Sequence, residues 1–268
     1  MKKILLLAIA IACLQLTVSA QFDNMFYYPQ KGEKVGYKLP DYREDVYLAA
    51  DSDTLHSVLL KPKGKATATI FYIHGNSGNI TVCDEILTAL VNGGFQVFTT
   101  DFRGFGESSG TPTHLNIAKD GQMVFDYLIN RPDVKDTKLV VYGASIGTQL
   151  AAKLVKDNPE KVKLLVLEDG MSSFTDMALM SRPASQHAII RRDVTSPYSS
   201  IEDVKYITAV PKLIMHAKND RVVPFTQGQQ VFESAAEPKI FVETESGHVG
   251  VLKQNPQLAI GKIKELLK

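Results

Sequence analysis

The chain has 268 residues, of which 30 are Lys or Arg, 29 are Asp or Glu and 44% are hydrophobic. These fractions exclude a disordered chain, which would be poorer in apolar residues and carry more net charge. Two cysteines are too few for a disulfide framework, and a net charge of +1 gives no general attraction to nucleic acid. The length allows one large α/β domain or two small domains.

The first twenty residues have the pattern of a secretory signal peptide. A cationic start, Met1-Lys2-Lys3, precedes a nearly continuous apolar run from Ile4 to Leu16, and the small residues Val18 and Ala20 stand before a cleavage point. The apolar run is shorter than the roughly 20 residues of a membrane-spanning helix. We therefore expect export to the periplasm or the exterior after cleavage near Ala20, with residues 21–268 as a single domain.

Two other fates of this segment are alternatives to cleavage. The segment could remain as an N-terminal membrane anchor, or it could be the signal of a lipoprotein that is lipidated at Cys13. Ala10 and Leu14 depart from the pattern around a lipid-attachment cysteine. No later stretch is long and apolar enough for a membrane span, so no stable span is expected in the mature chain.

Cleavage alters both charge and cysteine content. It removes Lys2 and Lys3, which leaves 28 of the 30 basic residues against 29 acidic ones, and it leaves Cys83 as the one cysteine. A single cysteine forms no internal disulfide, so the hydrophobic core must stabilise the fold even in an oxidising compartment. Cys83 is expected to be a small buried residue on a helix.

Strand and helix patterns alternate along the mature chain. Two alternating segments around a turn at 51–53, residues 44–50 and 54–61, predict an antiparallel hairpin. Short apolar runs then predict buried strands of a parallel sheet at 67–73, 95–100, 138–142, 163–167, 212–216 and 239–243. Helical spacing of apolar residues predicts helices at 81–92, 118–130, 147–157, 226–236 and 255–267. The predicted fold is a mostly parallel sheet with helices on both faces.

One interval breaks this alternation. More than 40 residues separate the apolar runs at 163–167 and 212–216, with two prolines and no strand pattern between them. In such a sheet, an insertion at this point covers the carboxyl ends of the strands, where ligands bind. We expect a short cap over residues 170–207.

A serine stands on a predicted strand-to-helix turn. Gly143-Ala144-Ser145-Ile146-Gly147 matches G-x-S-x-G, with a strand pattern before it and a helix pattern after it. This context is that of a nucleophile elbow, in which Gly143 and Gly147 leave room for neighbouring backbone at the sharp bend. Ser145 is therefore the expected nucleophile, held where a helix N-terminus favours developing negative charge.

Serine needs a base to take its proton. His248 lies in a loop after the last predicted strand, at the same sheet edge as Ser145, and is the expected base. The other histidines fit other positions: His56 the hairpin, His216 an apolar strand, His114 a surface loop, His187 the insertion, and His74 the loop after the first buried strand.

A carboxylate must orient the base. Asp220 follows the strand at 212–216, and the chain order Ser145, Asp220, His248 is that of an α/β-hydrolase triad. Glu168 and Asp169, which follow the strand at 163–167, compete for this role. A structural role of Asp220, as the cap of the next helix, would leave His248 without an obvious partner.

Oxyanion stabilisation needs two backbone N–H groups aimed at one point. The N–H of Ile146, next to the nucleophile, is one expected donor. The second is assigned to Asn76 in the loop His74-Gly75-Asn76-Ser77-Gly78, where the glycines allow a close approach to the site. His74 is expected to brace this loop.

Together these motifs resemble α/β-hydrolase-fold serine hydrolases over about residues 44–267. The H-G-N-x-G loop and the Asp101-Phe-Arg-Gly-Phe-Gly-Glu-Ser108 segment are similar to depalmitoylase-like α/β-hydrolase-domain proteins and serine-aminopeptidase-type hydrolases. The resemblance implies that Ser145, Asp220 and His248 form the triad. It also implies that Asp101 and Arg103 brace the wall of the site. Thr148 stands where relatives often have glycine.

The expected activity is hydrolysis of the carboxylic ester or thioester bond of a small acyl substrate through an acyl-enzyme. A peptidase on the same triad is one alternative, and a non-catalytic binding protein on the same fold is another. The serine at the elbow argues against haloalkane dehalogenase chemistry, which uses a carboxylate nucleophile. No cluster with metal-site spacing and no dinucleotide-binding motif is present in the sequence, so no metal and no cofactor are expected.

Overall fold

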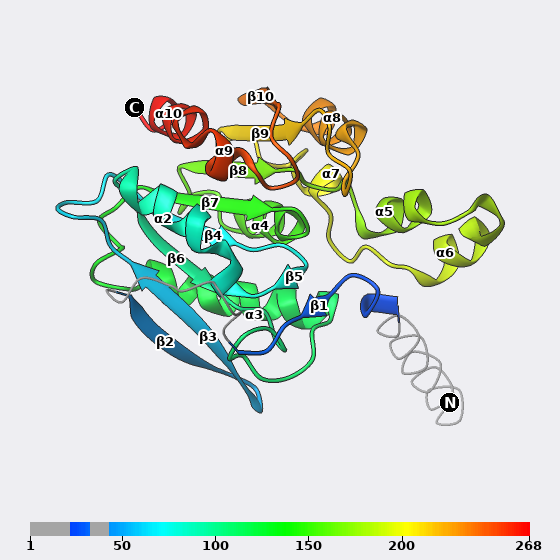
Figure 1. Cartoon of the computed structure of the whole chain (residues 1–268), viewed down its shortest axis with the longest axis horizontal. Helices are drawn as coiled ribbons and strands as arrows, with labels where there is room; N and C mark the ends of the chain where they lie inside the picture. Colours follow the sequence, from blue (N-terminus) through cyan, green and yellow to red (C-terminus); the bar gives the residue numbers. More distant parts are fainter. Residues whose placement is uncertain (1–21, 33–42) are drawn as a thin grey trace, which may run out of the picture.

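The computed structural model describes residues 22–32 and 43–268, so the predicted signal peptide lies outside the described residues. The strands of the main sheet are β2 (Glu44–Ala50), β3 (Asp53–Leu60), β4 (Thr69–Ile73), β6 (Gln96–Thr100), β7 (Leu139–Ala144), β8 (Leu164–Glu168), β9 (Lys212–Ala217) and β10 (Lys239–Thr244). Their order is β10-β9-β8-β7-β4-β6-β3-β2 (Figure 1). This sheet confirms the predicted α/β fold.

Strand β3 is antiparallel to both β2 and β6, and the other neighbouring strands of the sheet are parallel. The hairpin predicted from alternating residues is therefore present. Strand β4 lies at the centre, and the chain goes from it to β6 on one side and then returns to β7 on the other. Loops after the strands on either side of such a reversal diverge, which opens a crevice for ligands at the carboxyl edge.

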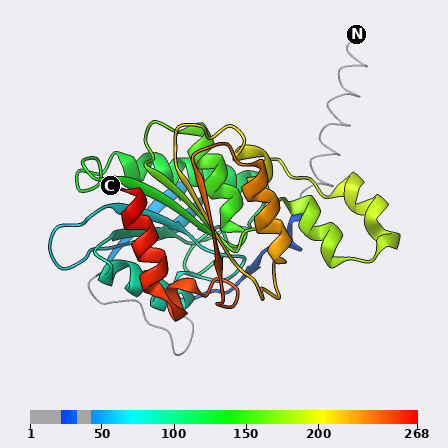
Figure 2. The same cartoon turned by 90° about the horizontal axis from the view of Figure 1, so that it is seen from above.

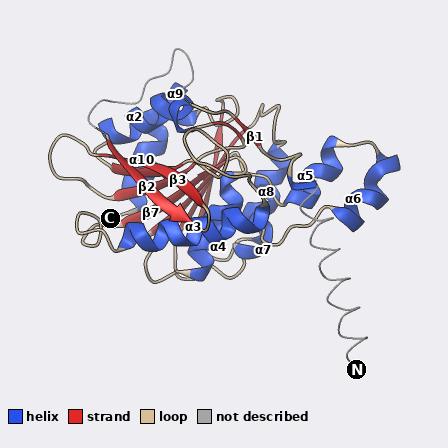
Figure 3. Cartoon of the chain, turned by 90° about the horizontal axis from the view of Figure 1, so that it is seen from below, coloured by secondary structure: helices blue, strands red, loops and turns tan. Residues whose placement is uncertain are grey.

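Helices cover both faces of the sheet (Figure 3). One face packs against α2 (Asp84–Asn92), α9 (Val251–Gln254) and α10 (Pro256–Leu266), preceded by the 3-10 turn η1 (Ile80–Cys83). The other face packs against α3 (His114–Ile129), α4 (Gly147–Asp157) and α8 (Phe225–Ser234). The buried strands contribute to both hydrophobic clusters because successive side chains point to opposite faces. Cys83 is buried at the end of η1, as expected.

Helix α3 begins four residues before the predicted start at 118. Thr113 caps it, with its hydroxyl accepting the N–H of Asn116 while the Asn116 side chain accepts the N–H of Thr113. The reciprocal bonds satisfy two of the free N–H groups of the first turn. The start of α3 is thus set by polar capping residues, which the spacing of apolar residues used for the prediction does not include.

The interval between β8 and β9 holds four helical pieces and, among the residues described, no strand. They are α5 (Phe174–Ser181), the 3-10 turn η2 (Ala184–Gln186), α6 (His187–Asp193) and α7 (Ser200–Asp203). Helices α5 and α6 extend beyond the end of the sheet (Figures 1 and 2). Gln149 of α4 holds both ends of the interval, because its amide donates to the carbonyl of Met171 (2.6 Å) and to the hydroxyl of Ser200 (2.8 Å).

A second, two-stranded sheet joins β1 (Tyr28–Pro29) to β5 (Ser77–Gly78) in parallel. It attaches the segment of residues 22–32, here called the N-terminal segment, to the loop that follows β4. Within the described parts of the chain, no helix has the length and apolar character needed to cross a membrane.

Candidate active site

Ser145 lies at a sharp turn between β7 and α4. Its φ of 53° is in the left-handed region, which non-glycine residues rarely adopt. Two hydrogen bonds hold the turn: the N–H of Ser145 donates to the carbonyl of Glu168 in β8 (2.9 Å), and the Thr148 hydroxyl donates to the carbonyl of Ser145 (2.6 Å). The strained turn points the Ser145 side chain away from the sheet edge. Thr148, which stands where related sequences often have glycine, thus stabilises this turn.

The two glycines of the motif are required by close backbone contacts. A Cβ atom on Gly147 would lie 2.3 Å from the carbonyl oxygen of Ile73, and one on Gly143 would lie 2.7 Å from the carbonyl oxygen of Gly147. Real Cβ atoms do not approach backbone so closely. The close packing of α4 on the end of β4 therefore depends on Gly147, and its packing on β7 depends on Gly143.

Ser145, His248 and Asp220 come together from the ends of three strands, β7, β10 and β9. His248 Nε2 lies 3.0 Å from Ser145 Oγ, and His248 Nδ1 lies 2.6 Å from Asp220 Oδ2. The Asp220 side chain is fully buried, whereas that of His248 is 19% exposed. This is the geometry in which a histidine takes the serine proton while a carboxylate orients the imidazole.

Asp220 is held in its charged form. Burial alone would raise the pKa of its carboxyl group, but hydrogen bonds from His248 and from the N–H groups of Val222 and Val223 outweigh burial, and the pKa is lowered. The Val222 and Val223 bonds, at 2.7 and 2.9 Å, both end on Oδ1 and leave Oδ2 for the histidine.

Neither competing acid is hydrogen-bonded to His248. Glu168 accepts the Tyr142 hydroxyl (2.6 Å) and the N–H of Val251 (3.1 Å). Burial and the nearby charge of Asp169 raise the pKa of Glu168 to about 7. Asp169 accepts two backbone N–H groups instead.

Asn76 and Ile146, the expected oxyanion donors, lie in the two loops that meet at Ser145. Gly75 is close enough that a Cβ atom there would lie 3.5 Å from Ser145 Cβ. In the described chain, the backbone N–H of neither Asn76 nor Ile146 donates a hydrogen bond to another residue. An N–H group without a partner in the protein is the kind of donor that an oxyanion hole uses.

The N-terminal segment shapes the Asn76 loop, a contact that the sequence did not reveal. The N–H of Tyr28 donates to the carbonyl of Asn76 (2.8 Å). The buried Asn79 side chain donates to the carbonyls of Gln30 (3.0 Å) and Gly32 (2.6 Å). Strands of two residues are too short to leave a periodic pattern in a sequence, so the pairing of β1 with β5 could not be predicted from it.

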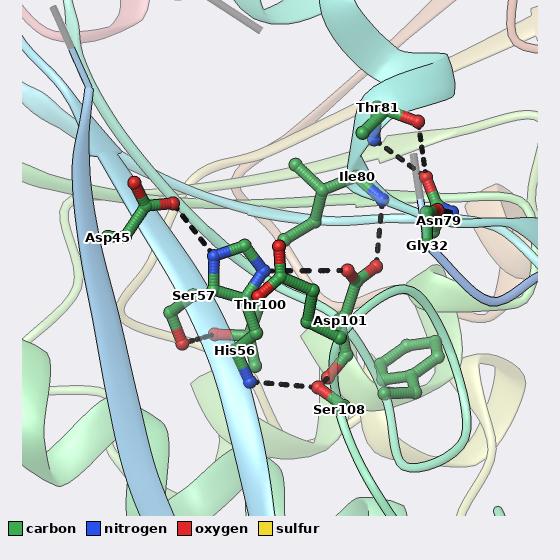
Figure 4. A network of polar contacts seen from close by, with 12 residues as sticks. Gly32, Asp45, His56, Ser57, Asn79, Ile80, Thr81, Thr100, Asp101 and Ser108 are labelled. Atoms are coloured by element: carbon green, nitrogen blue, oxygen red, sulfur yellow. Dashed lines mark hydrogen bonds and ion pairs between the residues drawn. The ribbon is translucent and has the colours of Figure 1, made fainter. Parts of the chain in front are cut away.

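His74 and Asp101 brace the same loop from the other side. His74 Nδ1 lies 2.7 Å from the carbonyl oxygen of Gly75, and its Nε2 accepts the N–H of Phe102 at 3.3 Å. Burial lowers the pKa of His74, which favours its neutral form. Asp101 Oδ1 accepts the N–H of Ile80 at 2.7 Å, where the loop ends (Figure 4).

His56 continues this network toward the hairpin. Its ring lies between Asp45 (2.8 Å) and Asp101 (3.9 Å), as Figure 4 shows. Arg103 is tied to three carboxylates, those of Asp51, Asp53 and Asp120, at 3.0, 2.7 and 2.6 Å. The Asp101–Arg103 segment is therefore fixed on both sides.

The expectation that His114 lies on a surface loop is wrong. It is the first residue of α3 and only 2% exposed. The N-terminal segment covers it: the Tyr27 hydroxyl lies 2.8 Å from Nδ1, and Asp23 accepts the His114 N–H at 2.8 Å. Its ring stacks on Phe174 of α5 with centroids 3.6 Å apart. Burial lowers the pKa of His114 to about 3, so the ring is neutral.

Neither of the remaining two histidines is hydrogen-bonded to Ser145 in the described chain. His187 begins α6, and its Nε2 lies 3.1 Å from the carbonyl oxygen of Arg182. His216 is buried in β9, as expected, and its Nε2 donates to the carbonyl of Val223 at 3.0 Å.

Asp169, His216 and Asp220 bring ligand-type atoms within 4.8 Å of one another. The two carboxylates of this group do not offer free ligand atoms. Those of Asp169 accept the N–H groups of Ala217 and Val249, and those of Asp220 accept two backbone N–H groups and His248. The group is better described as part of the acid–base arrangement than as a metal site.

The fold and this arrangement define an α/β-hydrolase. Residues 64–199 match the family described as serine aminopeptidase, S33, and the chain belongs to that family. It is 30% identical over 262 residues to the α/β-hydrolase domain-containing protein WAV2 of Arabidopsis thaliana, with 89% of this chain and 84% of that protein covered. It is 29% identical over 243 residues to the uncharacterized protein YfhR of Escherichia coli K12, covering 88% and 83%.

Solved structures show the same fold at low sequence identity. The esterase Pf2001 of Pyrococcus furiosus superposes with a TM-score of 0.70 at 16% identity, covering 90% of this chain and 96% of that one. An α/β-hydrolase of Vibrio vulnificus also has a TM-score of 0.70, at 21% identity, covering 85% and 82%. These structures show that the chain has the α/β-hydrolase fold, and the family match makes it a hydrolase.

Proposed function

We propose that this hydrolase is a serine esterase or thioesterase that acts on small acyl substrates. The observation that carries the proposal is the pair of contacts made by His248, 3.0 Å to Ser145 Oγ and 2.6 Å to Asp220 Oδ2. His248 Nε2 takes the serine proton as Oγ attacks the carbonyl carbon. Asp220 holds the imidazole tautomer and stabilises its charged form.

The N–H groups of Ile146 and Asn76 then stabilise the oxyanion that forms on the carbonyl oxygen. Collapse of this intermediate breaks the ester bond, and the alcohol or thiol leaves with the proton from His248. Water attacks the acyl-enzyme through the same base and releases the acid. Both halves of the proposed reaction use residues of this chain together with water.

An acyl substrate is favoured over a peptide N-terminus by the surroundings of the serine. An aminopeptidase needs a carboxylate for the substrate ammonium group, whereas Glu168 and Asp169 are buried and already accept hydrogen bonds. Exposed apolar side chains stand instead on the Asp220 loop and on the insertion after β8: Val222 is 51% exposed, Met180 of α5 48% and Ile189 of α6 49%. Such side chains fit an apolar acyl group.

The first test is labelling by a fluorophosphonate probe. The wild-type protein should be labelled at Ser145, and Ser145→Ala should lose the label and lower kcat by about 10³-fold or more. Ser185→Ala, at an exposed position between α5 and α6, is the matched control and should keep the label and the wild-type kcat. Labelling at a different residue would contradict the assignment.

A substrate panel separates the alternatives. p-Nitrophenyl esters of graded chain length, acyl thioesters and aminoacyl arylamides are compared on one preparation. Turnover of esters or thioesters supports the proposal, whereas turnover of arylamides alone would make the protein a peptidase. A folded protein with neither turnover nor labelling would be a binding protein.

We further propose that residues 1–20 direct export and are removed. The protein recovered from the extracytoplasmic fraction should then begin near Gln21 by N-terminal sequencing. Retention of the segment would indicate an anchor. A lipid-modified form that is lost in Cys13→Ala would indicate a lipoprotein.

A further inference from the structure

The carboxyl end of β8 lies at the centre of the site although none of its residues contacts His248. The carbonyl of Glu168 accepts the N–H of Ser145 at 2.9 Å. The next residue, Asp169, is 1% exposed and donates its own N–H to the carbonyl of Met215 in β9 at 2.9 Å. This strand end is thus bonded to the serine turn on one side and to β9 on the other.

The Asp169 carboxylate joins the two loops that carry the acid and the base. Its Oδ1 accepts the N–H of Ala217 at 2.7 Å, and its Oδ2 accepts the N–H of Val249 at 2.6 Å. Ala217 is the last residue of β9 and lies three positions before Asp220. Val249 directly follows His248. Each oxygen therefore holds one of the two loops.

The backbone around these bonds is strained. Val249 has a φ of 50° and Asp169 a φ of 48°, in a region that L-residues rarely adopt and β-branched residues avoid. Such conformations persist only where surrounding contacts enforce them, and they cluster at active sites. The bond to Asp169 is a contact that directly enforces the turn at Val249, and this turn directs the His248 side chain.

We propose that Asp169 is a positioning residue that ties the Asp220 loop to the His248 loop and thereby keeps the imidazole aligned with Ser145. This inference rests on the proposed function. A carboxylate suits the role because two N–H donors face its two oxygens. An amide offers one acceptor oxygen, so in Asp169→Asn an NH2 group would face the N–H of either Ala217 or Val249.

The test compares Asp169→Asn with Asp203→Asn. Asp203 is also a buried aspartate, but its side chain pairs with Lys156 at 2.6 Å instead of with the site loops. We expect Asp169→Asn to lower kcat and the rate of fluorophosphonate labelling on the order of 100-fold, as small misplacements of a catalytic group do, with little change in KM. Asp203→Asn should keep the wild-type kcat and labelling rate.

A spectroscopic readout separates positioning from general destabilisation. The Nδ1 proton of His248, in a short bond to Asp220, should give a far-downfield proton resonance in the wild-type protein and in Asp203→Asn. In Asp169→Asn this resonance should shift or broaden while the far-UV circular dichroism stays native. If Asp169→Asn does not fold, Asp169→Glu, which keeps two acceptors but displaces them, should show the same loss of kcat.

Two outcomes would overturn the inference by different routes. A folded Asp169→Asn with wild-type labelling rate and an unshifted resonance would refute the positioning role and leave the proposed function intact. Absence of Ser145-dependent labelling in the wild-type protein would refute the proposed function, and the inference with it, before any Asp169 variant is made.

Discussion

Replacement of Glu168 by Gln should make the protein more stable at alkaline pH. The Glu168 side chain is 1% exposed, and burial together with the charge of Asp169 raises its pKa from 4.5 to about 7. Gln keeps both contacts, because its oxygen can accept the N–H of Val251 and its NH2 can donate to the Tyr142 hydroxyl. The substitution therefore removes the titrating charge with little change in shape.

The size of the effect follows from the two pKa values. A carboxyl group with a higher pKa in the folded protein binds its proton more tightly there. Its contribution to stability is complete below the unfolded pKa of 4.5 and is lost as the pH rises through about 7. A pKa difference of about 2.5 at about 1.4 kcal/mol per pKa unit amounts to about 3.5 kcal/mol. This is a large part of the 5–15 kcal/mol by which domains of roughly this kind are stable.

Urea unfolding measures the effect directly. Far-UV circular dichroism is the suitable signal because the chain contains no Trp. The free energy of unfolding of Glu168→Gln, relative to wild type, should rise by about 2.5 kcal/mol between about pH 5 and about pH 8. Glu160→Gln, at an exposed glutamate, is the control and should show no such rise. A difference for Glu168→Gln that does not vary with pH would refute the reasoning.

Three further substitutions test other parts of the site. Asn79→Ala leaves two carbonyls of the N-terminal segment without their donor, so the free energy of unfolding should fall by about 1–3 kcal/mol, and an unchanged urea midpoint would contradict the role of Asn79. Gly147→Ala places a Cβ atom 2.3 Å from the Ile73 carbonyl oxygen, so fluorophosphonate labelling should be lost or the protein should not fold; a folded, fully labelled variant would show that α4 can move. Burial opposes the charge on His56, but hydrogen bonds to Asp101 and Asp45 outweigh burial and raise the pKa of His56. The charged ring therefore stabilises the folded protein fully at acidic pH, and this contribution is lost as the pH rises through the folded pKa of His56. His56→Gln should therefore cost more stability at acidic than at alkaline pH, and the opposite order in urea titrations would exclude a charged His56.

The order of elements was predictable from the sequence because each depends on a short local pattern. The helix expected over 147–157 has the observed bounds, and the strand expected at 212–216 ends one residue later. Strands buried on both faces are apolar throughout, and helices repeat apolar residues every three or four positions. The G-x-S-x-G turn was predictable for a similar reason, since only glycines fit its backbone contacts.

Contacts between distant residues had to come from the tertiary structure. Ser145 and His248 are 103 residues apart, and three acidic residues were available at the same sheet edge. Loop geometry decides that Asp220 contacts His248 while Asp169 is turned toward backbone N–H groups. All three acids stand at or just beyond the end of a strand, so position at the sheet edge does not separate them, and only the chain order of the triad favours Asp220.

What the sequence by itself determined about this protein is therefore the fold class, the serine turn and the set of residues at the active edge. The tertiary structure alone showed the distances between the base and its acid, the burial of His114, and the pairing of the N-terminal segment with the Asn76 loop. The physical reason is that local patterns record burial and backbone conformation. Hydrogen-bond partners depend instead on how loops far apart in the chain are brought to one edge of the sheet.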